Sequence, residues 1–254
     1  MQAAARYCYN KAESIELVNI LILILLPVLK IFFPNSKFLT LILILWFFAS
    51  QFLNLLVSKK IEQGAGLKAE FDQYVYGWSE NISNKLIHDS KILKTDHLKL
   101  FERLLSHTGT DKIAGVKDWY DFDHSINSKI KSAQQENIFF DKKVQIDMPV
   151  IIFSFIVIIT VCLLFWNHIE VSDLLATAFV TFASLSSKVI SLCFSLWNVN
   201  KLNQEAQHLI YDSTEEFEVQ RIINQIRRIN TLSFNFIYKI KRIALHKSFK
   251  NYNE

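Results

Sequence analysis

Residues 174–197 read LLATAFVTFASLSSKVISLCFSLW, an apolar run that carries a polar stripe and one positive charge. A helix of this length, 24 residues, can cross the hydrocarbon core of a bilayer. The polar residues follow each other at alternating steps of four and three, which places them on one side of a helix. They are Thr177, Thr181, Ser184, Lys188, Ser191, Ser195 and Asn198. The run therefore predicts a membrane helix with one polar side.

Lys188 decides how this stripe is interpreted. A cation near the centre of a spanning helix costs about 2.5–3.5 kcal/mol on insertion scales. The apolar runs contain no Asp or Glu, so the sequence offers no obvious counter-ion. Two interpretations stay open. The stripe packs against neighbouring helices through its small hydroxyl residues, or it lines a water-filled path.

The second interpretation implies self-association, because one copy with four spans is too small to enclose such a path. It assigns six residues to the pore lining, and Lys188 would bias the path towards anions. These residues are Thr177, Thr181, Ser184, Lys188, Ser191 and Ser195.

Three further apolar runs, at residues 17–33, 38–57 and 150–166, have the length of a membrane span or come close to it. A Pro-Asn-Ser-Lys turn at 34–37 and a polar loop at 167–173 join the four runs into two hairpins. The first run lacks a small-residue cleavage site, so we expect an uncleaved anchor. Gly and Pro are scarce, at five and three residues, which favours long helices.

The sequence thus predicts an all-α membrane protein with four transmembrane helices arranged as two hairpins, a cytoplasmic helical region between them and a long C-terminal cytoplasmic helix. The expected divisions are an N-terminal cytoplasmic segment near the membrane surface (1–16), hairpin 1 (17–57), a cytoplasmic helical domain (58–148), hairpin 2 (149–199) and the C-terminal cytoplasmic helix (200–254). Lys and Arg flank the runs on one side, whereas loop 167–173 has none. The positive-inside rule therefore places both termini in the cytoplasm.

Catalytic and metal motifs are missing from the sequence. It contains no His-Glu-x-x-His, no glycine-rich phosphate loop and no nucleophile motif. Cys8, Cys162 and Cys193 have no metal or disulfide spacing. We expect no enzyme, no cofactor, no metal site, and no DNA or RNA partner.

Candidate ligand residues lie in the polar regions. Trp119 and Tyr120, between acidic and basic residues, are either core residues of a helical domain or planes that stack a base. The stretch 221–253 has eight basic residues and no acidic one. It is either a solvated or lipid-facing surface or an anion site that contains Arg221, Arg227 and Arg228.

Helical periodicity is strong in two polar stretches. From Asp123 a helix is expected to run through the central region, and its Gln134, Asn137 and Asp141 are candidates for a gating contact with the C-terminal helix. In the C-terminal region a coiled-coil-like seam repeats at steps of four and three. Its members are Ile222, Ile226, Ile229, Ser233, Phe236, Ile240 and Ile243.

Two motifs resemble a known family. KDWY at 117–120 and QQENIFFDKKV at 134–144, set between two predicted hairpins, are similar to the signature of the SMODS-associating four-transmembrane effector family. The resemblance implies a bacterial inner-membrane effector of antiphage defence, encoded beside a cytoplasmic nucleotide synthase. A cyclic oligonucleotide would make it perforate or depolarise the membrane.

Three other classes stay open on the sequence alone. A constitutive ion channel or small transporter would conduct without a nucleotide, and a membrane-anchored hydrolase would turn a nucleotide over. A structural anchor for a cytoplasmic partner would do neither.

Overall fold

The computed structural model of the chain describes residues 1–33, 35–107, 126–143, 154, 158, 171–211, 216–231, 244 and 248. Within these ranges the side chains at 31, 126–129, 171–186 and 211 are left undescribed. The described part contains seven helices and no strand, so the all-α prediction is confirmed there. The helices are α1 (Gln2–Phe32), α2 (Lys37–Val75), α3 (Asn84–Asp96), α4 (Leu98–Ser106), α5 (Ile126–Asp141), α7 (Val171–Tyr211) and α8 (Glu216–Ile226).

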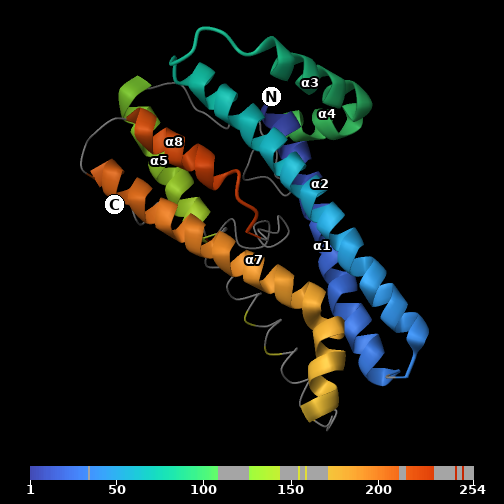
Figure 1. Cartoon of the computed structure of the whole chain (residues 1–254). Helices are drawn as coiled ribbons and strands as arrows, with labels where there is room; N and C mark the ends of the chain where they lie inside the picture. The colour runs from blue at the N-terminus through green and yellow to red at the C-terminus, as the bar shows by residue number, and fades with distance from the viewer. Residues whose placement is uncertain are drawn as a thin grey trace.

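Helices α1 and α2 form the first predicted hairpin (Figure 1). Ser36 caps α2, because its hydroxyl accepts a hydrogen bond from the backbone N–H of Leu39 at 3.3 Å. The buried Lys30 ammonium donates to Thr40 Oγ1 at 2.9 Å and to the carbonyl oxygen of Ser36 at 3.2 Å. The tip of the hairpin is therefore fixed by side chains from both helices.

The outer surface of this hairpin is apolar. Large hydrophobic side chains are exposed along both runs, as on a surface that faces acyl chains. On α1 they extend from Leu17 to Phe33 and on α2 from Phe38 to Leu56. By length and composition, α1 and α2 are the two described helices that can cross a membrane. The third run is largely outside the described residues and the fourth lies in α7, so the four-span topology stays a prediction.

Both helices of the hairpin continue well past their apolar runs. Residues 2–16 are the first turns of α1, and Ala3, Ala4, Ala5 and Cys8 are buried against Leu67, Phe101 and Leu104. The segment 1–16 is thus part of α1, and its small side chains form a helical core; its expected place near the membrane surface stays a prediction.

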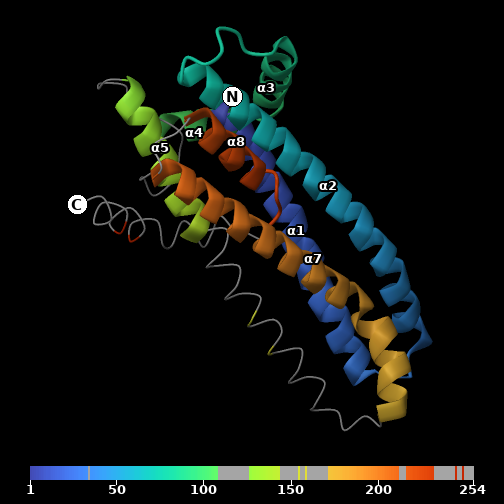
Figure 2. The ribbon, with the colours of Figure 1, turned by 60° about the vertical axis from the view of Figure 1, so that its left-hand side comes forward.

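Gly64 explains how closely α1 and α2 approach each other at this point. A Cβ atom at Gly64 would lie 3.2 Å from the carbonyl oxygen of Ala5 and 3.3 Å from Cys8 Cβ. At Gly77, φ is +72°, a conformation that favours glycine, and it ends α2. The chain then turns into α3 and α4, at the end of the molecule opposite the hairpin tip (Figure 2).

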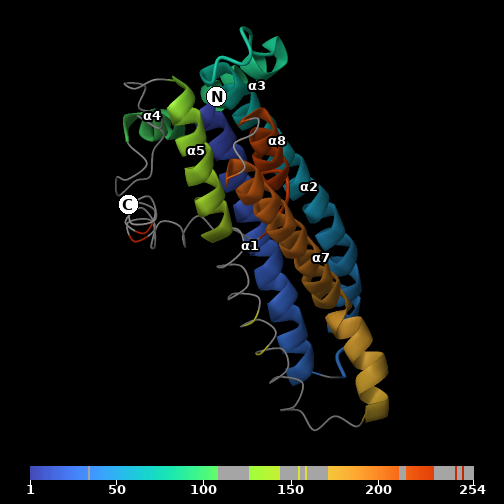
Figure 3. The same cartoon turned by 90° about the vertical axis from the view of Figure 1, so that its left-hand side faces the viewer.

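Helices α5, α7 and α8 form a second unit beside the first (Figure 3). Its apolar core joins Ile138 of α5 to α7 and α8. The other buried members are Val199, Ala206, Ile210, Val219, Ile222, Ile223 and Ile226. We call these three helices the second unit, and α1–α4 the first unit.

A single C-terminal helix over residues 200–254 is a wrong prediction. Helix α7 runs on to Tyr211, and α8 begins at Glu216 and ends at Ile226. The reason is the apolar face of α8, which needs cover and finds it by packing on α7. Ile222 and Ile226 of the predicted seam are buried in this core and Ile229 packs against it. The seam positions beyond residue 231 lie outside the described residues.

Candidate functional site

A polar cluster joins α1, α2 and α7 at the boundary between the two units. The side chain of Lys188 is 8% exposed and forms an ion pair with Glu16, whose side chain is 3% exposed. The Lys188 ammonium also donates to Asn54 Oδ1 at 2.9 Å. The Asn19 amide lies 3.5 Å from the same oxygen. The predicted lack of a counter-ion is wrong, because Glu16, immediately before the first run, supplies one.

The contact with Asn54 shows where Lys188 lies along the first hairpin. Asn54 lies sixteen residues after Phe38, about 24 Å along the helix axis. It stands close to Leu56, where the exposed apolar surface of α2 ends. Lys188 is therefore level with the end of that apolar surface, on the side away from the hairpin tip. Its depth in a membrane stays a prediction.

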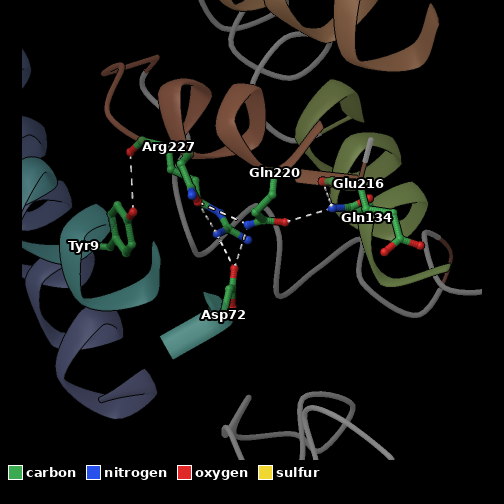
Figure 4. Close-up of polar contacts among 7 residues, drawn as sticks. Tyr9, Asp72, Gln134, Glu216, Gln220 and Arg227 are labelled. Atoms are coloured by element: carbon green, nitrogen blue, oxygen red, sulfur yellow. Dashed lines mark hydrogen bonds and ion pairs between the residues drawn. The ribbon is translucent and has the colours of Figure 1, made fainter. Parts of the chain in front are cut away.

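A second polar network links the two units at the level of α8 (Figure 4). Asp72 of α2 is fully buried, and its Oδ2 accepts a hydrogen bond from Arg227 Nη1 at 2.5 Å and from Gln220 Nε2 at 3.1 Å. The Tyr9 hydroxyl of α1 donates to the carbonyl oxygen of Arg227 at 3.4 Å. Removal of one partner from a buried ion pair is strongly destabilising, because the other charge then stays buried without compensation.

Gln134 of α5 extends this network through the second unit. Its Nε2 donates to the carbonyl oxygen of Glu216 at 2.6 Å and lies 3.5 Å from Gln220 Oε1. Asn203 of α7 donates to the carbonyl oxygen of Ile138 at 3.0 Å. Helices α5, α7 and α8 are therefore held in register by buried amides as well as by their apolar core.

Polar contacts join the two units. Among the described residues, the ion pairs Lys188–Glu16 and Asp72–Arg227 cross the boundary between them. The rings of Trp78 and Phe217 also meet across it, 5.7 Å apart at 60°. The charged groups of these pairs can be hydrated when the units part.

Burial perturbs several titratable groups near the second network. The pKa of Lys68 is lowered to about 8, first by desolvation and then by the charge of Arg227. Burial raises the pKa of Cys8 to about 11, and it also raises the pKa of the Tyr9 hydroxyl and of Glu136. Burial is therefore the main cause of these shifts, and neighbouring charges modify it.

The lowered pKa of Lys68 gives a prediction for stability against pH. Above a pH of about 8 the folded state releases this proton, while the unfolded state keeps it up to its ordinary pKa near 10.5. The unfolded state then binds more protons, so this group makes stability rise with pH within that window. The difference in free energy of unfolding between the wild type and Lys68→Met should change accordingly from pH 8 to 10. A pH-independent difference would contradict the assignment.

The residues predicted to line a path are only partly placed. Thr177, Thr181 and Ser184 lie in α7, but their side chains are among those left undescribed. Ser191 is exposed and Ser195 half-buried, on the flank of the face that carries Lys188. Whether this stripe lines a path stays a prediction.

The predicted ligand and gating residues fall into three groups. Gln134 and Arg227 belong to the same buried network, in which Gln220 contacts Gln134 and Asn224 accepts from both Gln220 and Arg227. Asn137 and Asp141 are half-buried on α5, Arg228 is exposed, and the exposed Arg221 pairs with Glu218 at 2.6 Å. Trp119 and Tyr120 lie outside the described residues.

Sequence reasoning missed Glu16, Asn54, Asp72 and Gln220. Glu16 carried one usable signal, a carboxylate at the very start of an apolar run that nearly reaches the length of a span. In the described part, no group of His, Cys, Asp and Glu can hold a metal ion.

The fold and the site define an α-helical membrane protein with two helical units joined by buried ion pairs. The chain belongs to the family of the SMODS-associating 4TM effector domain, which matches all of it, residues 1–254. The family's name describes a transmembrane effector of nucleotide-signalled defence. No curated protein and no solved structure matches the chain.

Proposed function

We propose that this chain is an oligomeric effector that opens a conducting path across the bacterial inner membrane in response to a nucleotide second messenger during antiphage defence. Family membership supports the class of effector. The observation that carries the mechanism is the pairing of Lys188, the charge of the polar stripe, with Glu16 and Asn54 inside one subunit. In this state the stripe's cation is neutralised and is withheld from any path.

Opening then consists of parting the two units. When α7 moves away from α1, Lys188 and the hydroxyl side chains of the stripe become available to water. Removing one partner from a buried ion pair costs about 3–5 kcal/mol. A ligand must favour the open state by about 5.5 kcal/mol to move an equilibrium from 1:99 to 99:1. A nucleotide that makes several charged contacts can supply a difference of this size.

The ligand would act on the second unit, at the end away from the membrane. Arg221 and Arg228 present exposed guanidinium groups there, next to the buried Arg227. Phosphates pair well with such groups. A shift of α8 would be transmitted to Asp72 through Gln220 and Arg227. Trp119 and Tyr120 remain candidates for stacking a base.

The proposed orientation places both termini and helices α3, α4, α5 and α8 in the cytoplasm. The basic residues that flank the spans support it through the positive-inside rule. Lys30 and Lys37 lie near the opposite side, but Lys30 is bound inside the hairpin tip. A synthase encoded nearby would supply the nucleotide on the cytoplasmic side. No catalytic step is proposed for this chain.

Lys188→Leu tests the role of the charge in the path. The substitution removes the cation that pairs with Glu16, so the closed state should weaken and vesicles should leak without an activator. The open path should also lose its preference for anions, which reversal potentials in an asymmetric chloride gradient measure. Unchanged leakage and selectivity would contradict the assignment.

Leakage from proteoliposomes tests the function itself. We expect release of a trapped dye or chloride with one member of a panel of cyclic oligonucleotides, and none without it. Equal flux without nucleotide would instead indicate a constitutive channel or transporter. Neither flux nor nucleotide binding would indicate a structural anchor, and consumption of the nucleotide would indicate a hydrolase.

A further inference from the structure

Helix α7 carries an exposed apolar stripe that no other described residue of the chain covers. The stripe consists of Ser187, Ile190, Phe194, Trp197 and Lys201, at steps of three, four, three and four. Ile190, Phe194 and Trp197 are 56%, 67% and 65% exposed. We infer that this stripe is a subunit interface, covered by α7 of a second copy of the chain. The inference rests on the proposed function and gives its oligomer a contact surface.

The position of the apolar stripe along the membrane normal argues that lipid does not cover it. The exposed apolar surface of α2 ends at Leu56, and Lys188 bonds to Asn54 close to that point. Helices α2 and α7 both run from the hairpin tip towards α8 (Figure 1). Trp197 follows Lys188 by nine residues, about 13 Å further along the axis. The aromatic end of the stripe therefore lies beyond the hydrocarbon that covers hairpin 1.

The spacing and the charges fit a second copy of the same helix. Alternating steps of three and four are those of a coiled-coil seam, in which each apolar residue enters a hole on an identical partner. Lys201 and Glu205, one turn apart, are both exposed at the end of the stripe, and no ion pair involves either of them in the described part. Each can pair with the opposite charge of the next copy.

Polar residues border the apolar stripe of α7. Ser191 and Asn198 are exposed beside it. In a coiled-coil contact, residues in such positions lie at the margin of the seam, where they stay within reach of water.

Cys193 offers a direct test, since it is exposed between Ile190 and Trp197, whereas Cys8 is buried. In a full-length Cys162→Ser background, a short bis-maleimide should link two copies through Cys193 in membranes. The product should vanish in Cys193→Ser. Failure to cross-link in membranes that conduct would overturn the interface and leave the proposed function intact. If the protein stays monomeric in membranes and never conducts, both the interface and the proposed function are contradicted.

Matched variants separate interface from lipid contact. Phe194→Ser should weaken self-association about tenfold or more, as expected for a large aromatic side chain at a hot spot. Phe48 of α2 is exposed to 66%, nearly as much as Phe194, and Phe48→Ser should leave the cross-linked fraction unchanged. Equal effects of the two variants would contradict the inference. A fluorophore on Cys193 gives a second measure. If doxyl lipids quench it strongly in the oligomer, the stripe faces lipid, which would also contradict the inference.

Discussion

Glu16→Gln should make membranes leak without any nucleotide. The substitution leaves the Lys188 ammonium buried without its carboxylate, and only Asn54 remains as a described polar partner. The closed arrangement should lose about 3–5 kcal/mol, which approaches the 5.5 kcal/mol that separates a mostly closed from a mostly open population. Dye release from proteoliposomes without activator measures the effect. Because Lys188 is retained, the path should keep its preference for anions, unlike that of Lys188→Leu.

The control for this prediction is a neutral substitution in the same cluster. Asn19→Ala removes only an amide that lies 3.5 Å from Asn54, so it should leave the vesicles almost tight. Far-ultraviolet circular dichroism of both variants should match the wild type. If Glu16→Gln folds and its vesicles stay as tight as those of the wild type, the pair does not hold the closed state.

Asp72→Asn should release α8 from the first unit. Asp72 accepts from both Arg227 and Gln220, so the substitution removes a buried negative charge that lies against the Arg227 guanidinium. We expect the free energy of unfolding in detergent to fall by about 3–5 kcal/mol. Proteases should also cut near α8 faster. Urea titration followed by circular dichroism, together with timed proteolysis, measures both effects.

The chain contains a matched control for this substitution. Arg221 and Glu218 form an ion pair of similar length on α8, but both side chains are exposed, at 52% and 39%. Glu218→Gln should therefore cost at most about 1 kcal/mol. If Asp72→Asn and Glu218→Gln lower the free energy of unfolding by similar amounts, the buried position of Asp72 does not increase its contribution to stability.

Local patterns predicted much of the helical fold. The runs at 17–33 and 38–57 lie in α1 and α2, and Ser36 caps the second helix as a turn residue there should. The helix that contains Gln134 was also found from its periodicity. Gln134 does contact α8, in line with the expected contact with the C-terminal region, although a gating role remains a prediction. Each of these features depends on residues that are close together in the chain.

Contacts between residues far apart in the chain could not be predicted from the sequence. Lys188 and Asn54 are 134 positions apart and Arg227 and Asp72 are 155 apart. Periodicity gives the face on which a residue lies, but it does not give the helix that covers this face. The same limit explains the C-terminal error, because nothing local to residues 212–226 reveals that α8 packs back on α7. The absence of Gly and Pro then favoured a longer helix than the chain forms.

Composition does not show how much of the run at 174–197 faces lipid. The run continues past Lys188, which contacts Asn54 of α2 near the end of the exposed apolar surface of that helix. Val199, two residues after the run, is fully buried in the core that α7 shares with α8. Apolar residues that serve a protein core and those that face lipid look the same in sequence.

Exchange of the two charges tests the central claim most directly, that the Lys188–Glu16 pair holds the closed state. Anion flux without nucleotide should be measured for Glu16→Lys, for Lys188→Glu and for the double variant in identical proteoliposomes. The account predicts that both single variants leak and that the double variant, which restores an ion pair in reverse, is tight again. Leakage from the double variant that equals the sum of the single variants, or tight single variants, would contradict it.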